Sequence, residues 1–220
     1  MTAVLFDLDD TLYNRAPCVK RVLTEQLAMY RHKFPGATYE DFQQHFPGFD
    51  FQRGFAGQPD VYDSLLHHFG VTDISSEAMV ANFRELLVKY IVDYDEGTPV
   101  LTVLRARKLK LGIVTNGPAD IQGRKVNALE LNAKVDAVLI SGTEGIRKPD
   151  VEIFRRAAAR LGVSPSDCWF VGDNPHADIY GAKMVGMQTV WIPRGQTWPD
   201  DLDIVPDHTI SKLDEIQKLI

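Results

Sequence analysis

The chain has 220 residues, of which 45% are hydrophobic and 25% charged, and its formal net charge is −6. These proportions are typical of a globular protein and exclude a disordered or fibrous chain. The acidic balance offers no basic surface for nucleic acid or anionic lipid, and no stretch approaches the ~18 consecutive apolar residues of a membrane span. Two distant cysteines, Cys18 and Cys168, indicate a reduced protein. We therefore expect a cytoplasmic protein and take a monomer as the starting assumption.

The first predicted element is a short apolar strand over residues 3–8. Apolar residues then recur at helical spacing around residues 19–30 and 79–91, with shorter helical pieces around 39–46 and 61–69. A loop with Gly and Pro, residues 47–59, separates the two shorter pieces. Residues 14–93 are therefore predicted to form a helical domain inserted after the first strand.

Short apolar runs alternate with amphipathic stretches through the second half of the chain, which is typical of a parallel sheet covered by helices. The further strands are predicted at residues 111–115, 137–140, 169–172, 189–192 and 208–210. The fold class is therefore α/β, with a parallel-sheet core formed by residues 1–13 and 94–220 and an all-helical insertion between these two segments.

Two aspartates, Asp7 and Asp9, follow the first strand. Alternate residues of a strand point to one face, so these carboxylates can converge at the edge of the sheet where ligands bind in open α/β proteins. The same spacing occurs in Asp93/Asp95 and Asp201/Asp203, so the spacing alone is weak evidence. The position directly after a buried strand distinguishes the first pair.

Polar residues also follow three later strands. Thr115 and Asn116 end the second strand, Lys148 closes the loop after the third, and Asp173 and Asp178 follow the fourth. Each residue alone has an ordinary alternative: Thr115 as a turn residue, Lys148 as a surface charge and Asp173 as a helix cap. The same pattern at four successive strand ends predicts a shared site.

These four segments together resemble the ordered motifs of the haloacid dehalogenase-like hydrolase superfamily. They are D-x-D-x-T at residues 7–11, Thr115 after an apolar strand, Lys148 before a proline, and G-D-x-x-x-x-D at residues 172–178. The helical insertion resembles the cap of the superfamily's phosphatase branch. The resemblance implies a Rossmann-like core, a mobile cap, Mg²⁺ and a small phosphorylated metabolite as substrate.

The resemblance also implies residue roles that agree with the chemistry. Asp7 would attack phosphorus, and Asp9 would act as general acid and then as base. Thr115, Asn116 and Lys148 would bind the phosphoryl group and stabilise its charge. The Mg²⁺ ligands would be the Asp7 carboxylate, the Asp9 backbone carbonyl and Asp173, with Asp178 bound to the ion directly or through one of its other ligands. The expected activity is therefore hydrolysis of a small phosphomonoester, such as a nucleotide or sugar phosphate.

Three other activities remain open on the same residues. A sugar-phosphate mutase shares all four motifs. A haloacid dehalogenase uses an aspartate nucleophile but needs neither an acid at position 9 nor Mg²⁺. A phospho-acceptor receiver module also combines acidic residues, Thr and Lys around an aspartate, but it has no place for the helical insertion.

Residues in the insertion are candidates for substrate contact. Arg53 would contact an anionic substrate, and Phe49, Phe51 or Phe55 would line a pocket. His176 is assigned to a helix start or the surface rather than to catalysis.

Overall fold

The computed structural model describes residues 2–44 and 59–220. The chain divides into two compact units: residues 1–14 together with 95–220, which we call the core unit, and residues 15–94, which we call the helical unit. The division expected from the sequence, at residues 14 and 93, differs by one residue at each crossing. In the part of the chain that the structure describes, no helix is both long and apolar enough to cross a membrane.

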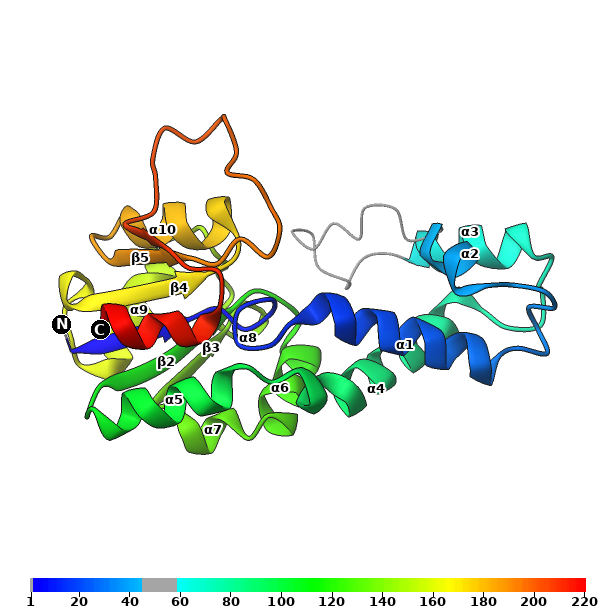
Figure 1. Ribbon diagram of the computed structural model, residues 1–220, viewed down its shortest axis with the longest axis horizontal. Helices are drawn as coiled ribbons and strands as arrows, with labels where there is room; N and C mark the ends of the chain where they lie inside the picture. Colours follow the sequence, from blue (N-terminus) through cyan, green and yellow to red (C-terminus); the bar gives the residue numbers. More distant parts are fainter. Residues whose placement is uncertain (1, 45–58) are drawn as a thin grey trace. The chain divides into compact units, whose positions relative to one another are not determined.

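The core unit is built on a six-stranded sheet in which every neighbouring pair of strands is parallel (Figure 1). The strands, in their order across the sheet, are β3 (Ala137–Ile140), β2 (Lys110–Thr115), β1 (Ala3–Phe6), β4 (Cys168–Gly172), β5 (Gln188–Trp191) and β6 (His208–Thr209). Leu5 of β1 lies in register with Gly112 on one side and Phe170 on the other. The predicted parallel α/β fold is confirmed.

Helix α9 (Val151–Leu161) covers one face of this sheet. Its apolar residues recur at helical spacing and pack with Ala3 and Leu5 of β1, the two residues that point to that face. Asp150 caps the start of α9 by accepting the Glu152 N–H, and Gly162, with a φ of 65°, ends the helix. Burial on both faces explains why β1 is apolar without alternation.

The remaining helices of the core unit connect or flank the strands. They are α5 (Gly97–Ala106), α6 (Ala119–Ala128), α7 (Leu131–Lys134), α8 (Ser141–Glu144), η3 (Pro165–Asp167), the π-helical turn η4 (Pro175–Tyr180), α10 (Gly181–Lys183), η5 (Leu213–Glu215) and α11 (Ile216–Leu219).

Arg194 joins the two chain segments at which the insertion begins and ends. Its guanidinium donates to the backbone carbonyl of Asp10 at 2.8 Å and forms two hydrogen bonds with the Glu96 carboxylate, at 2.7 and 3.2 Å. The backbone N–H groups of Glu96 and Gly97 also donate to the carbonyl of Leu12. The two segments are therefore fixed to each other within the core unit.

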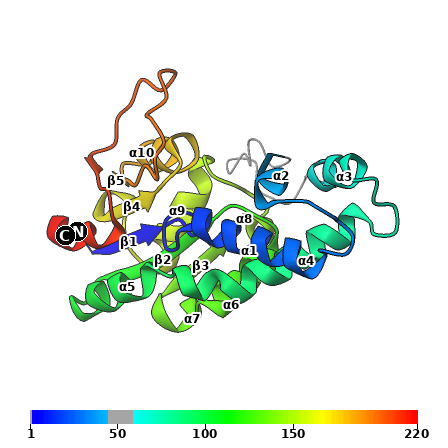
Figure 2. The same ribbon diagram turned by 45° about the vertical axis from the view of Figure 1, so that its right-hand side comes forward.

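The helical unit contains α1 (Arg15–Met29), α2 (Tyr39–Gln44), α3 (Pro59–His68), α4 (Ser76–Tyr90) and η2 (Ile91–Tyr94). Figure 2 shows α1 and α4 side by side, and these two helices make the most extensive contact among the described helices of the unit. Ser75 caps α4 by accepting the Ala78 N–H. The described helices share one apolar core.

A network of buried hydrogen bonds connects the helices within this core. The Gln26 amide donates to the Met79 carbonyl at 3.0 Å and to Asn82 at 3.1 Å, and its carbonyl accepts the Tyr62 hydroxyl at 2.5 Å. Gln26 and Tyr62 are fully buried, and burial raises the pKa of Tyr62 well above its ordinary value. These hydrogen bonds therefore join α1, α3 and α4 in the buried interior of the helical unit.

Replacing Tyr62 by Phe is expected to destabilise the protein by ~1–3 kcal/mol, because the buried Gln26 carbonyl would lose its donor. Thermal unfolding of the full chain would measure this loss. The control is Tyr180→Phe, which removes the hydroxyl of a tyrosine that is 39% exposed and should leave stability unchanged. Equal melting temperatures for Tyr62→Phe and the unmodified protein would contradict the expected loss.

Candidate active site

The predicted site residues lie where neighbouring strands end. Asp7 follows β1, Thr115 ends β2, and Asp173 follows β4. Because these three strands are adjacent and parallel, their carboxyl ends meet at one edge of the sheet. The parallel pairing of β1 and β4 thus brings Asp7 and Asp173, more than 160 positions apart in the sequence, to the same edge of the sheet.

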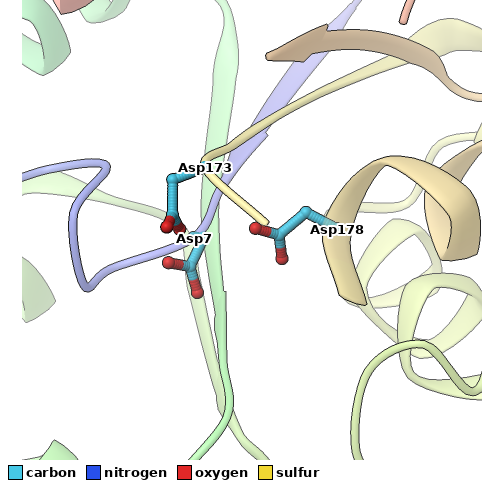
Figure 3. A group of neighbouring side chains, drawn as sticks. All are labelled: Asp7, Asp173 and Asp178. Atoms are coloured by element: carbon cyan, nitrogen blue, oxygen red, sulfur yellow. The ribbon is translucent and has the colours of Figure 1, made fainter. Parts of the chain in front are cut away.

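Three buried carboxylates form the centre of this site. One oxygen from each of Asp7, Asp173 and Asp178 lies within 4.8 Å of the others. Figure 3 shows the three carboxylates gathered around a common space. Asp7 comes from the end of β1, Asp173 from the end of β4, and Asp178 from η4.

Lys148 supplies a positive charge to this group. Its ammonium forms an ion pair with Asp7 and a second with Asp178 at 2.6 Å. Lys148 is 2% exposed, so burial acts to lower its pKa, but the nearby Asp178 and Asp7 carboxylates outweigh that effect and raise the pKa above its ordinary value. Lys148 therefore remains an ammonium ion at neutral pH.

The Asp7 carboxyl titrates near neutral pH in the absence of a metal ion. Burial is the main cause and raises its pKa from 3.8 to about 7. The Lys148 charge acts in the opposite direction, and the Asp178 and Asp9 carboxylates add to the rise. A further cation beside Asp7 would favour the ionised form.

A glycine allows Asp178 to reach the centre. A Cβ atom on Gly172 would lie 2.3 Å from the Asp178 carboxylate, so a larger residue would displace that side chain. The carboxylate also accepts the backbone N–H of Asn174 at 3.0 Å. The cap of η4 is Asn174, which accepts the Ala177 N–H, so the alternative role of Asp173 as a helix cap does not apply.

The other phosphoryl-binding candidates lie on β2 and its loop. Thr115 is 1% exposed, and its hydroxyl oxygen accepts the Gln122 amide at 2.5 Å. The side chain of Asn116 accepts the backbone N–H of Lys148 and donates to the Lys148 carbonyl, both at 2.9 Å. Asn116 thus joins the β2 loop to the segment that carries Lys148, and its side chain is engaged there.

The Asp9 carboxylate is not part of the acidic centre. One of its oxygens accepts the Lys125 ammonium at 2.5 Å and the Tyr13 hydroxyl, and the other accepts the Gln122 amide at 2.8 Å. The sequence alone does not point to Gln122, Lys125 or Tyr13 as part of the site. Gln122 and Lys125 lie three residues apart in a helical stretch after Thr115, so they share one helix face. That spacing is the one feature of the sequence that could have linked them to the site.

Two further predictions concern His176 and four residues of the insertion. His176 is 43% exposed in its side chain and lies 3.4 Å from the Asp201 carboxylate, at the surface of the core unit. Arg53, Phe49, Phe51 and Phe55 lie outside the described residues.

The acidic centre fits a divalent cation. Three buried carboxylates lie together in it, and among the described residues the Lys148 ammonium forms ion pairs with two of them, Asp7 and Asp178. Buried charges of one sign are costly unless a counter-ion is present, and carboxylate oxygens are the ligands that Mg²⁺ prefers. The group could therefore hold a metal ion, with Asp7, Asp173 and Asp178 as ligands.

The comparison with known proteins identifies the same superfamily. Residues 1–186 match the haloacid dehalogenase-like hydrolase family. A phosphoserine phosphatase of Thermus thermophilus is 32% identical, and the match covers 98% of each chain. A glyceraldehyde 3-phosphate phosphatase of Methanopyrus kandleri is 33% identical, with 99% of this chain and 96% of the relative covered.

Solved structures of similar architecture span the whole chain. A haloacid dehalogenase-like phosphatase from Thermococcus onnurineus is 29% identical, with a TM-score of 0.64, and the match covers 100% of this chain and 97% of that chain. A 2-haloacid dehalogenase from Pseudomonas syringae is 30% identical, with a TM-score of 0.63 and the same coverage. The chain belongs to the haloacid dehalogenase-like hydrolases, and within them it is a phosphatase with a helical insertion between β1 and β2.

Proposed function

We propose that this phosphatase hydrolyses a small phosphomonoester in the presence of Mg²⁺, through a phosphoryl group carried transiently on Asp7. The observation that supports this proposal is the buried contact of Asp7 with Lys148, beside two further carboxylates, at the carboxyl edge of the sheet. Such a carboxylate can reach a substrate phosphorus while the ammonium and a metal ion offset the charge.

In the first step, an Asp7 oxygen forms a bond to phosphorus while the bond from phosphorus to the leaving oxygen breaks. Asp9 gives its proton to that oxygen, so the product leaves as an alcohol. Lys148 and the Thr115 hydroxyl stabilise charge on the transferred phosphoryl group. Because Asn116 holds the backbone of Lys148, it contributes by fixing the position of that ammonium.

In the second step, a water molecule attacks the phosphorus of the Asp7 phosphate, and Asp9 accepts a proton from that water. Inorganic phosphate leaves, and the Asp7 carboxylate is restored. Asp7, Asp173 and Asp178, with the backbone carbonyl of Asp9, would hold Mg²⁺, which supplies positive charge that offsets the phosphate and the carboxylates.

The direct test is hydrolysis of p-nitrophenyl phosphate. We expect release of p-nitrophenol with Mg²⁺, loss of activity on chelation with EDTA, and recovery when Mg²⁺ is restored. Asp173→Ala should abolish turnover or raise the Mg²⁺ requirement. The control is Asp201→Ala, whose exposed carboxylate lies 3.4 Å from the surface residue His176 and should leave activity unchanged.

Full activity after exhaustive chelation would contradict the role of a metal ion. Release of chloride from a 2-chloro acid, with no release of inorganic phosphate, would favour the dehalogenase. An isomerised sugar phosphate without free phosphate would favour the mutase. A panel with phosphoserine, glyceraldehyde 3-phosphate, nucleoside monophosphates and sugar phosphates would then define the substrate.

A further inference from the structure

Helix α6 places two long polar side chains in the interior of the core unit. Gln122 is 2% exposed and Lys125 is 5% exposed. They lie three residues apart, hence on the same face of the helix. Burial of a lysine is costly unless its charge is paired, so the position calls for a specific partner.

That partner is the carboxylate of Asp9. The Lys125 ammonium lies 2.5 Å from one Asp9 oxygen, which also accepts the Tyr13 hydroxyl. The Gln122 amide lies 2.8 Å from the other oxygen. Since donors from two directions hold both oxygens, the orientation of the carboxylate is defined as well as its position.

Gln122 connects this carboxylate to the phosphoryl-binding side of the site. Its amide nitrogen also donates to the Thr115 hydroxyl oxygen at 2.5 Å. The hydroxyl accepts in that bond, so its own hydrogen can be donated to a phosphoryl oxygen. A Cβ atom on Gly117 would lie 2.7 Å from the Gln122 side chain, so the glycine leaves the space that Gln122 uses.

We propose that Lys125 is a positioning residue for Asp9, and that Gln122 fixes Asp9 relative to Thr115. The inference rests on the function proposed above, in which Asp9 transfers protons. A structural role alone does not require this pair, because a hydrophobic residue of similar volume often replaces a buried ion pair without loss of stability. Lys125 instead contacts Asp9, the residue that must face the leaving group in the proposed mechanism.

The test compares Lys125→Met with Lys125→Arg. Misplacement of a reacting group by about 1 Å costs up to ~100-fold in rate, so Lys125→Met should lower kcat by ~10–100-fold while KM changes little. Lys125→Arg keeps the charge and should recover part of the loss. Lys183→Met is the matched control: it removes a part-buried ammonium of the core unit that pairs with Asp207 at 2.8 Å, and kcat should not change.

A second arm asks whether Lys125 acts through Asp9. In an Asp9→Asn background, Lys125→Met should lower the residual kcat by less than threefold, because the carboxylate that it positions is absent. The same fold-loss in both backgrounds, or an unchanged kcat in Lys125→Met, would overturn the proposal.

Thermal unfolding gives a result that does not depend on activity. It compares four proteins: the unmodified protein, Asp9→Asn, Lys125→Met and the double variant. We expect Asp9→Asn and Lys125→Met to be non-additive, with the double variant more stable than the sum of the two losses predicts. Additive losses would overturn the proposal. If the unmodified protein hydrolyses no phosphomonoester, the proposed function fails, and non-additivity would still support the role of Lys125 in holding Asp9.

Discussion

Replacing Asp7 by Asn is expected to abolish turnover, with a loss of ~10⁴-fold or more in kcat, because a neutral amide does not form the bond to phosphorus. Inorganic phosphate release under saturating substrate and Mg²⁺ would measure the loss. The matched control is Asp201→Asn, which makes the same chemical change on the surface of the core unit and should retain full activity. Turnover of Asp7→Asn within tenfold of the unmodified protein would remove Asp7 from the mechanism.

The same variant also has an expected effect on stability. Because the folded state raises the pKa of Asp7 from 3.8 to about 7, metal-free protein binds this proton more tightly when folded than when unfolded. The carboxyl group therefore costs stability progressively as the pH rises from about 4 to about 7, and the cost is constant above that range. The melting temperature of Asp7→Asn, relative to the unmodified protein in EDTA, should rise across this interval and then level off.

A relative melting temperature that does not change between pH 4 and pH 7 would show that the Asp7 carboxyl titrates in its ordinary range.

Replacing Lys148 by Met is expected to lower both activity and stability. Loss of one group that stabilises charge in the transition state costs ~10²–10³-fold in kcat. Removal of the ammonium also leaves the Asp7 and Asp178 carboxylates buried without this counter-ion, and breaking a buried ion pair in this way costs ~3–5 kcal/mol. Added Mg²⁺ should recover part of the stability by supplying positive charge to the same carboxylates.

The control for Lys148 is Lys134→Met, because Lys134 belongs to the same unit and donates to the Thr98 hydroxyl and the Leu129 carbonyl, away from the acidic centre. It should keep the unmodified kcat. A Lys148→Met protein that unfolds at the unmodified temperature and keeps full activity would contradict the assigned ion pairs.

The sequence predicts the sheet and the acidic centre for the same physical reason. Parallel strands buried on both faces are continuous apolar runs, so their ends can be located, and residues that follow them meet at one edge. The strand ends therefore place Asp7, Thr115, Asp173 and Asp178 at one edge of the sheet without any knowledge of distances. Lys148 reaches the acidic centre from a loop. The sequence suggests this placement only because that loop follows the third strand.

The surroundings of Asp9 could not be predicted in this way. Whether Gln122 and Lys125 face solvent or the site depends on the rotation of α6 about its axis, and tertiary packing sets that rotation. Similarly, the sequence offers Asp173 as a helix cap, whereas the backbone geometry of the turn makes Asn174 the cap of η4.

The most direct test of the mechanism is the location of the phosphoryl group during turnover. Asp9→Asn protein should still form the Asp7 phosphate with p-nitrophenyl phosphate, because the leaving phenolate needs little protonation, but it should lose the base for the second step. Acid quenching on the millisecond scale, followed by peptide mass spectrometry, should therefore find an added phosphoryl group on the peptide of residues 2–15 and assign it to Asp7. A phosphoryl group on any other residue, or full steady-state turnover by Asp9→Asn with no phosphorylated peptide at any time, would contradict the account.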